Sequence, residues 1–315
     1  MPKRTIGIGD EGSVSREQKR RAVGGNPQPT ELAHDDYTIG WICALPKEQT
    51  AAMAMLDHRH VNLPKAPNDP NSYTLGSVGK HNVVIACLPK GKTGTSSAAT
   101  VVTWIVSTFP SIKFCLMVGV GSGIPPVRLG DVVVSTPIGQ FSGVVQWDFG
   151  KAEEGGNLVR AGSLNSPPTS LLTALTKLES EHELTGSKIS EYLEELAEKW
   201  PKYLESSLLE DVLFKPHYNH VSKSLDCEIT QDFDGSDEER SCLLCDRTQV
   251  VKRKPRDMRV HYGLIASGNQ VIEDATFREK VNKNLGGKVL CIETEASLSS
   301  AKWICGCRVS LICSA

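Results

Sequence analysis

Short apolar runs that alternate with amphipathic segments along this chain predict an α/β protein. The runs are rich in β-branched residues and end in glycine or in a polar turn, which is typical of strands buried in a sheet. Apolar residues at helical spacing separate several of the runs, which favours helices packed on that sheet. The predicted strands cover 37–44, 72–78, 82–88, 115–120, 132–134, 141–149, 259–267, 287–292 and 309–313, and the predicted helices cover 46–56, 98–108, 165–181, 189–204 and 273–283.

The first residues stand outside this pattern. They are polar, carry the basic cluster Lys19–Arg21 and continue into Gly24–Pro27. Such a segment buries too little apolar surface to offset the entropy lost on ordering it. The sequence therefore predicts a disordered leader over 1–35 and one domain over 36–315, with an irregular surface insertion at about 186–257.

Composition narrows the class of protein by exclusion. The formal net charge is −2, so no overall field favours nucleic acid. No apolar run approaches the ~18 residues that span a bilayer, and no apolar segment follows the N-terminal basic residues as in a secretory signal. Cysteines within apolar runs are typical of buried thiols in a reducing compartment. We therefore expect a cytoplasmic or nuclear protein without a nucleic-acid or membrane partner.

Glycines and carboxylates gather at the predicted carboxyl ends of strands, where α/β sheets bind ligands. Gly119–Ile124 follows an apolar strand, and its glycines either cradle a ligand or form a tight turn between core strands. Glu48 follows the strand 37–44, where it either complements a helix dipole or holds a water as a base. Glu293 and Glu295 end another strand, where they either cap a helix or bind a ribose diol.

Familiar cofactor motifs are missing from the sequence. The loop 90–97 is rich in glycine and hydroxyl groups and opens a helix, so its N–H groups suit an anion. It lacks the Gly-Lys-Ser/Thr ending of a Walker A loop, and Gly119–Ile124 lacks the third glycine of a dinucleotide fingerprint. The sequence therefore disfavours nicotinamide chemistry, and no cofactor is expected.

Two close pairs of zinc-ligand types lie within the predicted insertion. They are His217 with His220 and Cys242 with Cys245. Tetrahedral zinc sites use such pairs, but the spacing between these two matches no standard zinc finger. The sequence therefore favours a plain loop with reduced thiols, and no metal site is expected.

The order of these motifs resembles the purine and uridine phosphorylase superfamily, in particular the nucleoside-phosphorylase-like domain at the N-termini of fungal NLR-type immune receptors. The strings that carry the resemblance are IGWICALPKE, LMVGVGSGIP, LGDVVVS, VVQWDFGK, SLNSPP, HYGLIASGNQVI and ETEA. They cover about 36–295. The resemblance implies a three-layer α/β/α phosphorylase/hydrolase-like fold with a mixed, partly closed sheet.

The resemblance also implies cleavage of the N-glycosidic bond of a nucleoside or nucleotide, with purines favoured. Glu48 matches the carboxylate that holds the attacking water in the hydrolytic branch, and Glu295 matches the glutamate that takes the ribose hydroxyls. The residues that match nucleoside-binding positions are Gly121, Ser122, Val271, Ile272, Glu293, Thr294 and Glu295.

The sequence departs from the superfamily at three places. Thr294 replaces the methionine of the Glu-Met-Glu motif. Gly130 stands where phosphorolytic members carry an arginine, which favours water over phosphate as the nucleophile unless Arg128 or Arg160 reaches the anion. No Asp or Glu follows Glu295, whereas the superfamily places there an Asp that protonates the purine.

This ending predicts a C-terminally truncated or altered domain with impaired cleavage. Its open sheet edge would favour self-association into a homo-oligomer. The alternative function is a catalytically weak nucleoside or nucleotide sensor or scaffold module of an immune-type receptor system. Under either function the expected partner is a small-molecule nucleoside or nucleotide, with phosphate left open as a co-substrate.

Overall fold

The computed structural model describes residues 32–153, 157–201, 211–219, 221, 244–272, 274–296 and 309–311. Two compact units divide the chain, Met1–Ala33 and His34–Ala315, and every element named below belongs to the second unit. The predicted leader lies, up to residue 31, outside the described residues. The described α-helices are α1 (Pro46–Ala54), α2 (Thr95–Thr108), α3 (Thr169–Thr185), α4 (Ile189–Lys199) and α5 (Ala275–Asn284).

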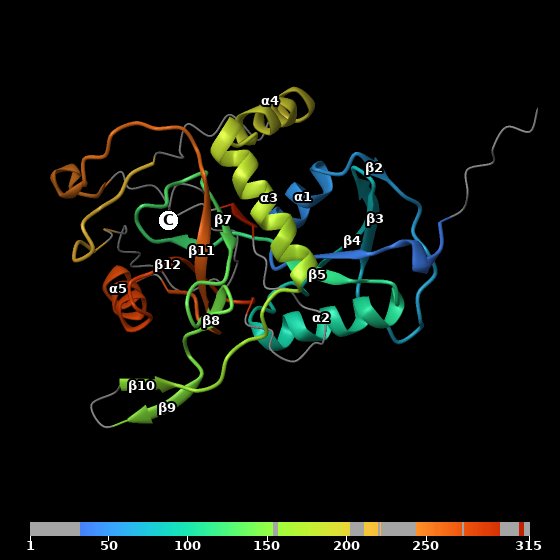
Figure 1. Ribbon diagram of the computed structural model, residues 1–315, viewed down its shortest axis with the longest axis horizontal. Coiled ribbons are helices and arrows are strands. Elements are labelled where there is room, and N and C mark those ends of the chain that lie inside the picture. Colours follow the sequence, from blue (N-terminus) through green and yellow to red (C-terminus); the bar gives the residue numbers. More distant parts are fainter. Residues whose placement is uncertain are drawn as a thin grey trace, which may run out of the picture. The chain divides into compact units, whose positions relative to one another are not determined.

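The first sheet is mixed and has five strands. They are β1 (Ile39–Cys43), β2 (His58–Arg59), β3 (Tyr73–Val78), β4 (His81–Cys87) and β5 (Phe114–Met117), in the order β2-β3-β4-β1-β5 (Figure 1). β1 pairs in parallel with β4 and β5, whereas β3 pairs antiparallel with β2 and β4. The predicted hairpin is therefore present, and β1 lies inside the sheet.

Helices cover both faces of this sheet. Side chains alternate between faces along a strand, so Gly40 and Cys43 of β1 belong to opposite faces. Cys43 packs in one cluster with Ala52 of α1. A Cβ atom on Gly40 would lie 3.5 Å from Ile105 Cγ2 of α2. α1 and α2 therefore lie on opposite faces, which is the three-layer arrangement that the resemblance implies.

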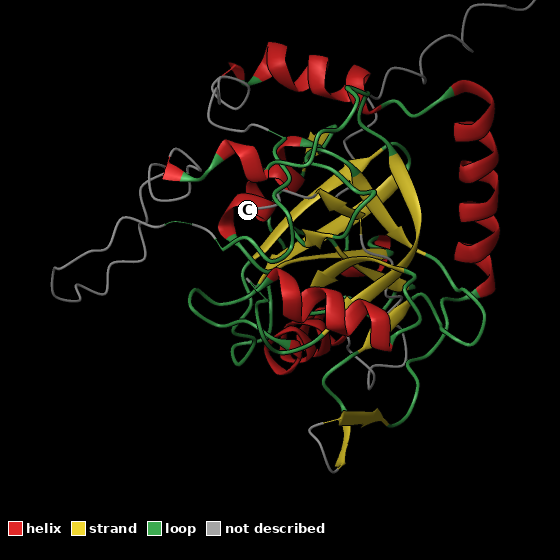
Figure 2. Cartoon of the chain, turned by 90° about the vertical axis from the view of Figure 1, so that its left-hand side faces the viewer, coloured by secondary structure: helices red, strands yellow, loops and turns green. Residues whose placement is uncertain are grey.

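The second sheet is also mixed. Its strands are β6 (Ser122–Gly123), β7 (Val132–Ser135), β8 (Val144–Gln146), β11 (Val260–Ser267), β12 (Val289–Glu293) and β13 (Val309–Leu311). Their order is β13-β7-β11-β12-β6, with β8 also paired to β11. β11 is parallel to β7, β8 and β12, while β6 and β13 join antiparallel. The α/β fold with mixed sheets is thus confirmed, and the described strands do not close into a barrel (Figure 2).

A two-stranded ribbon departs from the prediction. β9 (Gly150–Glu153) pairs antiparallel with β10 (Asn157–Arg160) and lies apart from both sheets in Figures 1 and 2. The sequence predicts a single strand over 141–149, but only Val144–Gln146 is a strand, because Gly143 adopts a φ of +103° that breaks regular strand geometry. The ribbon strands are too short and too polar for hydrophobic alternation to reveal them.

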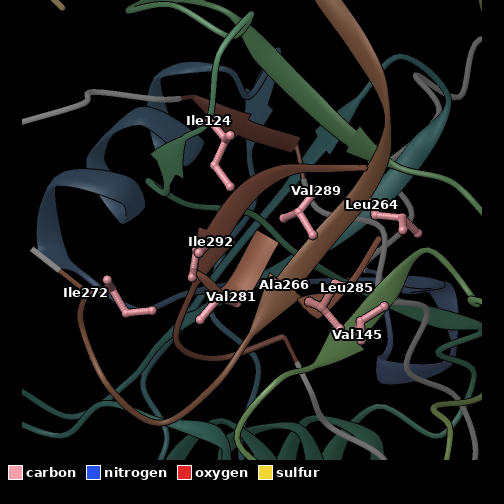
Figure 3. Close-up of a cluster of buried hydrophobic side chains, with 9 residues drawn as sticks. All are labelled: Ile124, Val145, Leu264, Ala266, Ile272, Val281, Leu285, Val289 and Ile292. Atoms are coloured by element: carbon pink, nitrogen blue, oxygen red, sulfur yellow. The ribbon is translucent and has the colours of Figure 1, made fainter. Parts of the chain in front are cut away.

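A core of aliphatic side chains fixes the second sheet against α5 (Figure 3). Its buried members are Ile124, Val145, Leu264, Ala266, Ile272, Val281, Leu285, Val289 and Ile292. Full burial of one such Ile, Leu or Val stabilises the fold by roughly 1.5–3 kcal/mol. Ile272 belongs to this core, so the segment that leaves β11 is anchored a few residues beyond the strand.

Charged groups attach the described part of the predicted insertion to the second sheet. Asp131, immediately before β7, is 0% exposed and accepts hydrogen bonds from Arg256, from the Arg259 N–H (2.9 Å) and from His261 Nε2 (2.8 Å). Burial alone would raise the pKa of Asp131, but these hydrogen bonds lower it well below its usual range. Arg253 lies 2.8 Å from Asp211, which makes a second ion pair within the same region.

Each described helix is too short or too polar to span a bilayer. Within the insertion, the described segments 211–219 and 244–257 contribute no strand to either sheet, and an isolated bridge joins Phe214 to Val250. The boundaries of the insertion remain a prediction.

Candidate functional site

Glu48 joins two strand ends through its carboxylate. It lies in the first turn of α1 and is 8% exposed. Its Oε2 accepts from the N–H groups of Ala44 (2.6 Å) and Leu45 (3.0 Å), and its Oε1 accepts from the N–H of Val120 (2.6 Å). An ionised carboxylate has about four acceptor positions, so these three bonds leave room for one more donor. Glu48 is therefore both a structural link and a candidate water-binding group.

The glycine loop after β5 packs directly on β12. A Cβ atom on Gly121 would lie 2.5 Å from Cys291 Sγ and 3.1 Å from the Ile292 carbonyl oxygen, so this position requires glycine. Ser122 and Gly123 then form β6, where Ser122 pairs with Ile292. Gly121 is therefore needed in the first place for close packing of this loop on β12.

The glutamates at the end of β12 have different partners. Glu293 Oε2 accepts from the Glu295 N–H (2.7 Å) and both its oxygens accept from the Ala296 N–H (3.0 and 3.1 Å), so this carboxylate caps the turn that follows the strand. Glu295 is 3% exposed and accepts a short hydrogen bond from the Thr294 hydroxyl. Glu293 thus has a structural role at the end of β12, and the role of Glu295 in binding ribose hydroxyls remains a prediction.

The predicted base-packing residues face different surroundings. Val271 is 72% exposed, whereas Ile272 is 9% exposed and packs in the core shown in Figure 3. A ligand at these strand ends can therefore meet the Val271 side chain, while Ile272 mainly holds the segment in place.

The predicted site segments do meet in the structure. The Val120 N–H binds Glu48, and the neighbouring Gly121 lies against Glu293, whose Cβ would be 3.6 Å from a Cβ on that glycine. The Gly268 N–H, just before the Val271 segment, donates to the Glu293 carbonyl oxygen at 3.1 Å. The carboxyl ends of β1, β5, β11 and β12 therefore converge, as their motifs predict.

The cationic groups considered for phosphate are engaged elsewhere. Arg128 Nη1 donates to the Lys254 carbonyl oxygen at 2.8 Å and lies 3.9 Å from Asp211. The Arg160 guanidinium lies over the Phe141 ring, 5.2 Å from its centroid. Gly130 has a φ of +82°, a conformation that an arginine side chain would strain.

Several residues near these strand ends were not singled out by sequence reasoning. Cys87 ends β4, and burial together with the negative charge of Glu48 raises the pKa of its thiol to about 11. Asp148 follows β8 and Asn269 follows β11, and the two are hydrogen-bonded to each other. A polar residue just after the predicted strand 259–267 is a signal for Asn269, whereas Cys87 and Asp148 lie within the predicted strands 82–88 and 141–149.

The zinc pairs are only partly described. His217 and Cys245 are described, whereas His220 and Cys242 lie outside the described residues. Among the described residues, no group of three or more His, Cys, Asp or Glu is arranged to hold a metal ion.

Solved structures of nucleosidases superpose on this chain. The chain superposes on the 5'-methylthioadenosine/S-adenosylhomocysteine nucleosidase from S. pneumoniae with 15% identity and a TM-score of 0.49, covering 87% of this chain and 84% of that one. The corresponding enzyme of Neisseria meningitidis superposes with 14% identity and a TM-score of 0.48, covering 88% of this chain and 85% of that one. A futalosine hydrolase mutant of Helicobacter pylori superposes with 14% identity and a TM-score of 0.47, covering 88% of this chain and 89% of that one.

A protein related in sequence to this chain is about four times as long as the matched part. No family model matches the chain. Over 276 residues it is 43% identical to a nucleotide-binding leucine-rich repeat (NLR)-like protein of Hyaloscypha variabilis. The match covers 84% of this chain and 25% of that protein, so the chain spans a quarter of the relative's length. The resemblance to NLR-type proteins that the motifs predict is thereby confirmed for this portion of such a protein.

Proposed function

We propose that this protein cleaves the N-glycosidic bond of a nucleoside or nucleotide, purines preferred, with water as the nucleophile. The observation that carries the proposal is the meeting of three segments at one set of strand ends. These are Glu48, the Gly121–Ser122 loop and the Glu293–Glu295 turn. In the superfamily that the sequence resembles, the matching positions bind the attacking water and the ribose.

The proposed reaction forms a bond from a water oxygen to the anomeric carbon and breaks the bond from that carbon to the base nitrogen. The electron pair leaves with the base, which takes up a proton, and the products are the free base and the free sugar. Positive charge develops on the sugar, so buried carboxylates nearby stabilise the transition state. Glu295 would accept the ribose hydroxyls, and the remaining acceptor position of Glu48 would hold the water.

The contacts of the cationic residues support water over phosphate. A phosphate nucleophile needs a cation beside it, and both Arg128 and Arg160 are held by other partners. The backbone of Gly130 disfavours the arginine that phosphorolytic enzymes carry at the matching position. We therefore expect cleavage that does not depend on added phosphate.

Protonation of the base is the weak step of this proposal. A general acid contributes roughly 10²–10⁴-fold to such a step. Residues 296–315 contain no Asp or Glu, although the superfamily's acid follows the glutamate motif. The proton for the base must therefore come from a group outside 296–315 or from solvent.

Binding without cleavage is the second candidate function. The carboxylate of Glu293 is occupied by backbone N–H groups, and that of Glu48 is largely so, which suits a fold that recognises a ligand without acting on it. The likeness to part of an NLR-like protein supports a sensor or scaffold role within a receptor.

Nucleoside turnover and binding separate the two candidates. The purified chain is incubated with adenosine, inosine, uridine and ATP, with and without phosphate, and free base is measured by chromatography while binding is measured by calorimetry. We expect adenine or hypoxanthine to be released at the same rate in both buffers. Binding without release would favour the sensor, and absence of both would refute the proposal.

Variants of two glutamates complete this test. Glu295→Gln is expected to weaken nucleoside binding by about tenfold or more, because an amide cannot accept both ribose hydroxyls. Glu198→Gln on the exposed side of α4 is the matched control and should bind like the unmodified protein. Equal affinities of Glu295→Gln and the control would contradict the role given to Glu295.

A further inference from the structure

We infer that Asn269 is a positioning residue that couples the start of α2 to the segment 268–272 and so fixes the wall of the site that faces the base. This inference rests on the proposed function for its ligand but not for its contacts. Asn269 lies two residues after the end of β11, in the second sheet, whereas α2 covers the first sheet. Its side chain therefore connects the two halves of the domain at the strand ends.

One end of the Asn269 amide caps α2. Its Oδ1 accepts from the Thr95 N–H (3.2 Å) and from the Thr95 hydroxyl (2.8 Å). The residue before the helix is Gly94, which has no side chain to serve as a cap and adopts a φ of +87°. A helix start usually takes such a cap from its own chain neighbour. Here the cap comes from a residue 174 positions away.

The other end of the amide is held by Asp148. Asn269 Nδ2 donates to Asp148 Oδ2 at 3.0 Å, and the Asn269 backbone N–H donates to the same oxygen at 2.8 Å. The second oxygen of Asp148 accepts from Gln146 Nε2 at 3.0 Å. Because Asp148 accepts in these contacts and both Thr95 groups donate in theirs, an amide that accepts on one side and donates on the other suits position 269.

These contacts bear on the proposed site through the segment that follows. The Gly268 N–H binds the carbonyl oxygen of Glu293, and Ile272 is anchored in the core. Asn269 lies between these two anchors, so its bonds decide how the exposed Val271 side chain is presented. Loss of the Asn269 bonds would free this segment and the start of α2 together.

The cap also bears on the loop 90–97. The sequence predicts that this loop offers the N–H groups of a helix start to an anion. The Thr95 N–H is instead occupied by Asn269, so the helix start loses its first donor for such a ligand. Its role in the structure is to hold the two halves of the domain in register.

Asn269→Asp gives a test that a merely structural role would not pass. The new carboxylate keeps an acceptor for Thr95 but faces Asp148, the titratable group in contact with this side chain, with a like charge. At pH 8 we expect the variant to bind adenosine about tenfold more weakly. At pH 5 a proton shared by the two carboxylates replaces the lost donor, and most of the affinity should return.

The controls are Asn269→Ala, which has no group to protonate, and Asn284→Asp, an equivalent change on the exposed end of α5. Asn269→Ala should bind weakly at both pH values, and Asn284→Asp should match the unmodified protein at each. Unchanged affinity of Asn269→Asp at pH 8, or a defect that persists unchanged at pH 5, would overturn the inference.

Hydrogen exchange decides the inference even if no nucleoside binds. Amides in 94–98 and in 268–272 should exchange faster together in Asn269→Asp at pH 8, after correction for the intrinsic rate, and should slow together at pH 5. Faster exchange in only one of the two segments would refute the coupling. Failure of nucleoside binding by the unmodified protein would instead refute only the proposed function.

Discussion

Glu48 and Glu293 illustrate what a single buried carboxylate does in this domain. Each accepts backbone N–H groups at the end of a strand, and each thereby fixes the turn that follows. The sequence placed both residues at strand ends and left two roles open for each, because the spacing of residues does not reveal the partner. The hydrogen bond that makes Glu48 a structural link comes from the N–H of Val120, which lies 72 positions away.

Glu48→Gln is expected to destabilise the fold by roughly 1–3 kcal/mol, because it leaves a buried N–H without an acceptor. The amide oxygen can keep the bonds from Ala44 and Leu45, but the amide nitrogen then faces the Val120 N–H, and two donors cannot bond. Urea denaturation followed by circular dichroism measures the change. Stability equal to that of the exposed control Glu198→Gln would show that Glu48 is not a structural link.

At the scale of elements, the sequence predicted where most strands and helices lie but not how the strands pair. β1, β4, β7 and β11 all lie within their predicted ranges or one residue beyond them. Their division between two sheets was not predictable, since pairing depends on neighbours far along the chain and alternation reports only burial. β9 and β10 were missed because four polar-rich residues give no periodic signal.

An ion pair between Asp131 and Arg256 stabilises the start of β7. The free energy that this pair contributes to folding depends on pH in a predictable direction. Asp131→Asn leaves the largely buried Arg256 without its carboxylate, which typically costs about 3–5 kcal/mol. The pKa of Asp131 is lowered in the folded state. Its contribution to stability is therefore fully present above the ordinary carboxyl value near 4 and is lost as the pH falls further.

Urea denaturation of the unmodified protein and of Asp131→Asn, at pH 7 and at pH 3, checks this expectation. The difference in the free energy of unfolding between the two proteins should be large at pH 7 and smaller at pH 3. A difference that grows on acidification would give the opposite sign to the linkage and would contradict the assigned ion pair.

At the scale of the whole molecule, the residues of the candidate site were predicted more from the family resemblance than from the pattern of hydrophobic and polar residues. The strand ends that carry Glu48, Gly121 and Glu293 converge as the superfamily's order of motifs implies. Asp148 and Asn269 could not be assigned from the sequence, because their contact joins elements that only the folded chain brings together.

The insertion provides the last prediction. A surface insertion can often be removed without loss of the core, but removal of 205–257 would also remove Arg256 and leave Asp131 buried without its main partner. We therefore expect that deletion to cost several kcal/mol, on the order of 3–5. A shorter deletion avoids this loss, because the chain on either side of it is already paired. The Val251 N–H donates to the Leu213 carbonyl oxygen at 2.8 Å, and the Lys215 N–H donates to that of Gln249 at 3.1 Å.

Replacing 216–248 with Asn-Gly should therefore close a two-residue hairpin between Lys215 and Gln249 without strain. The replacement keeps Asp211, Arg253 and Arg256, and shortening a loop changes its closure entropy little. We expect cooperative unfolding close to that of the full chain, whereas removal of 205–257 lowers the midpoint clearly. The short deletion also removes both zinc-type pairs, so a marked loss of stability together with loss of bound zinc, measured by mass spectrometry, would contradict the prediction of a plain loop.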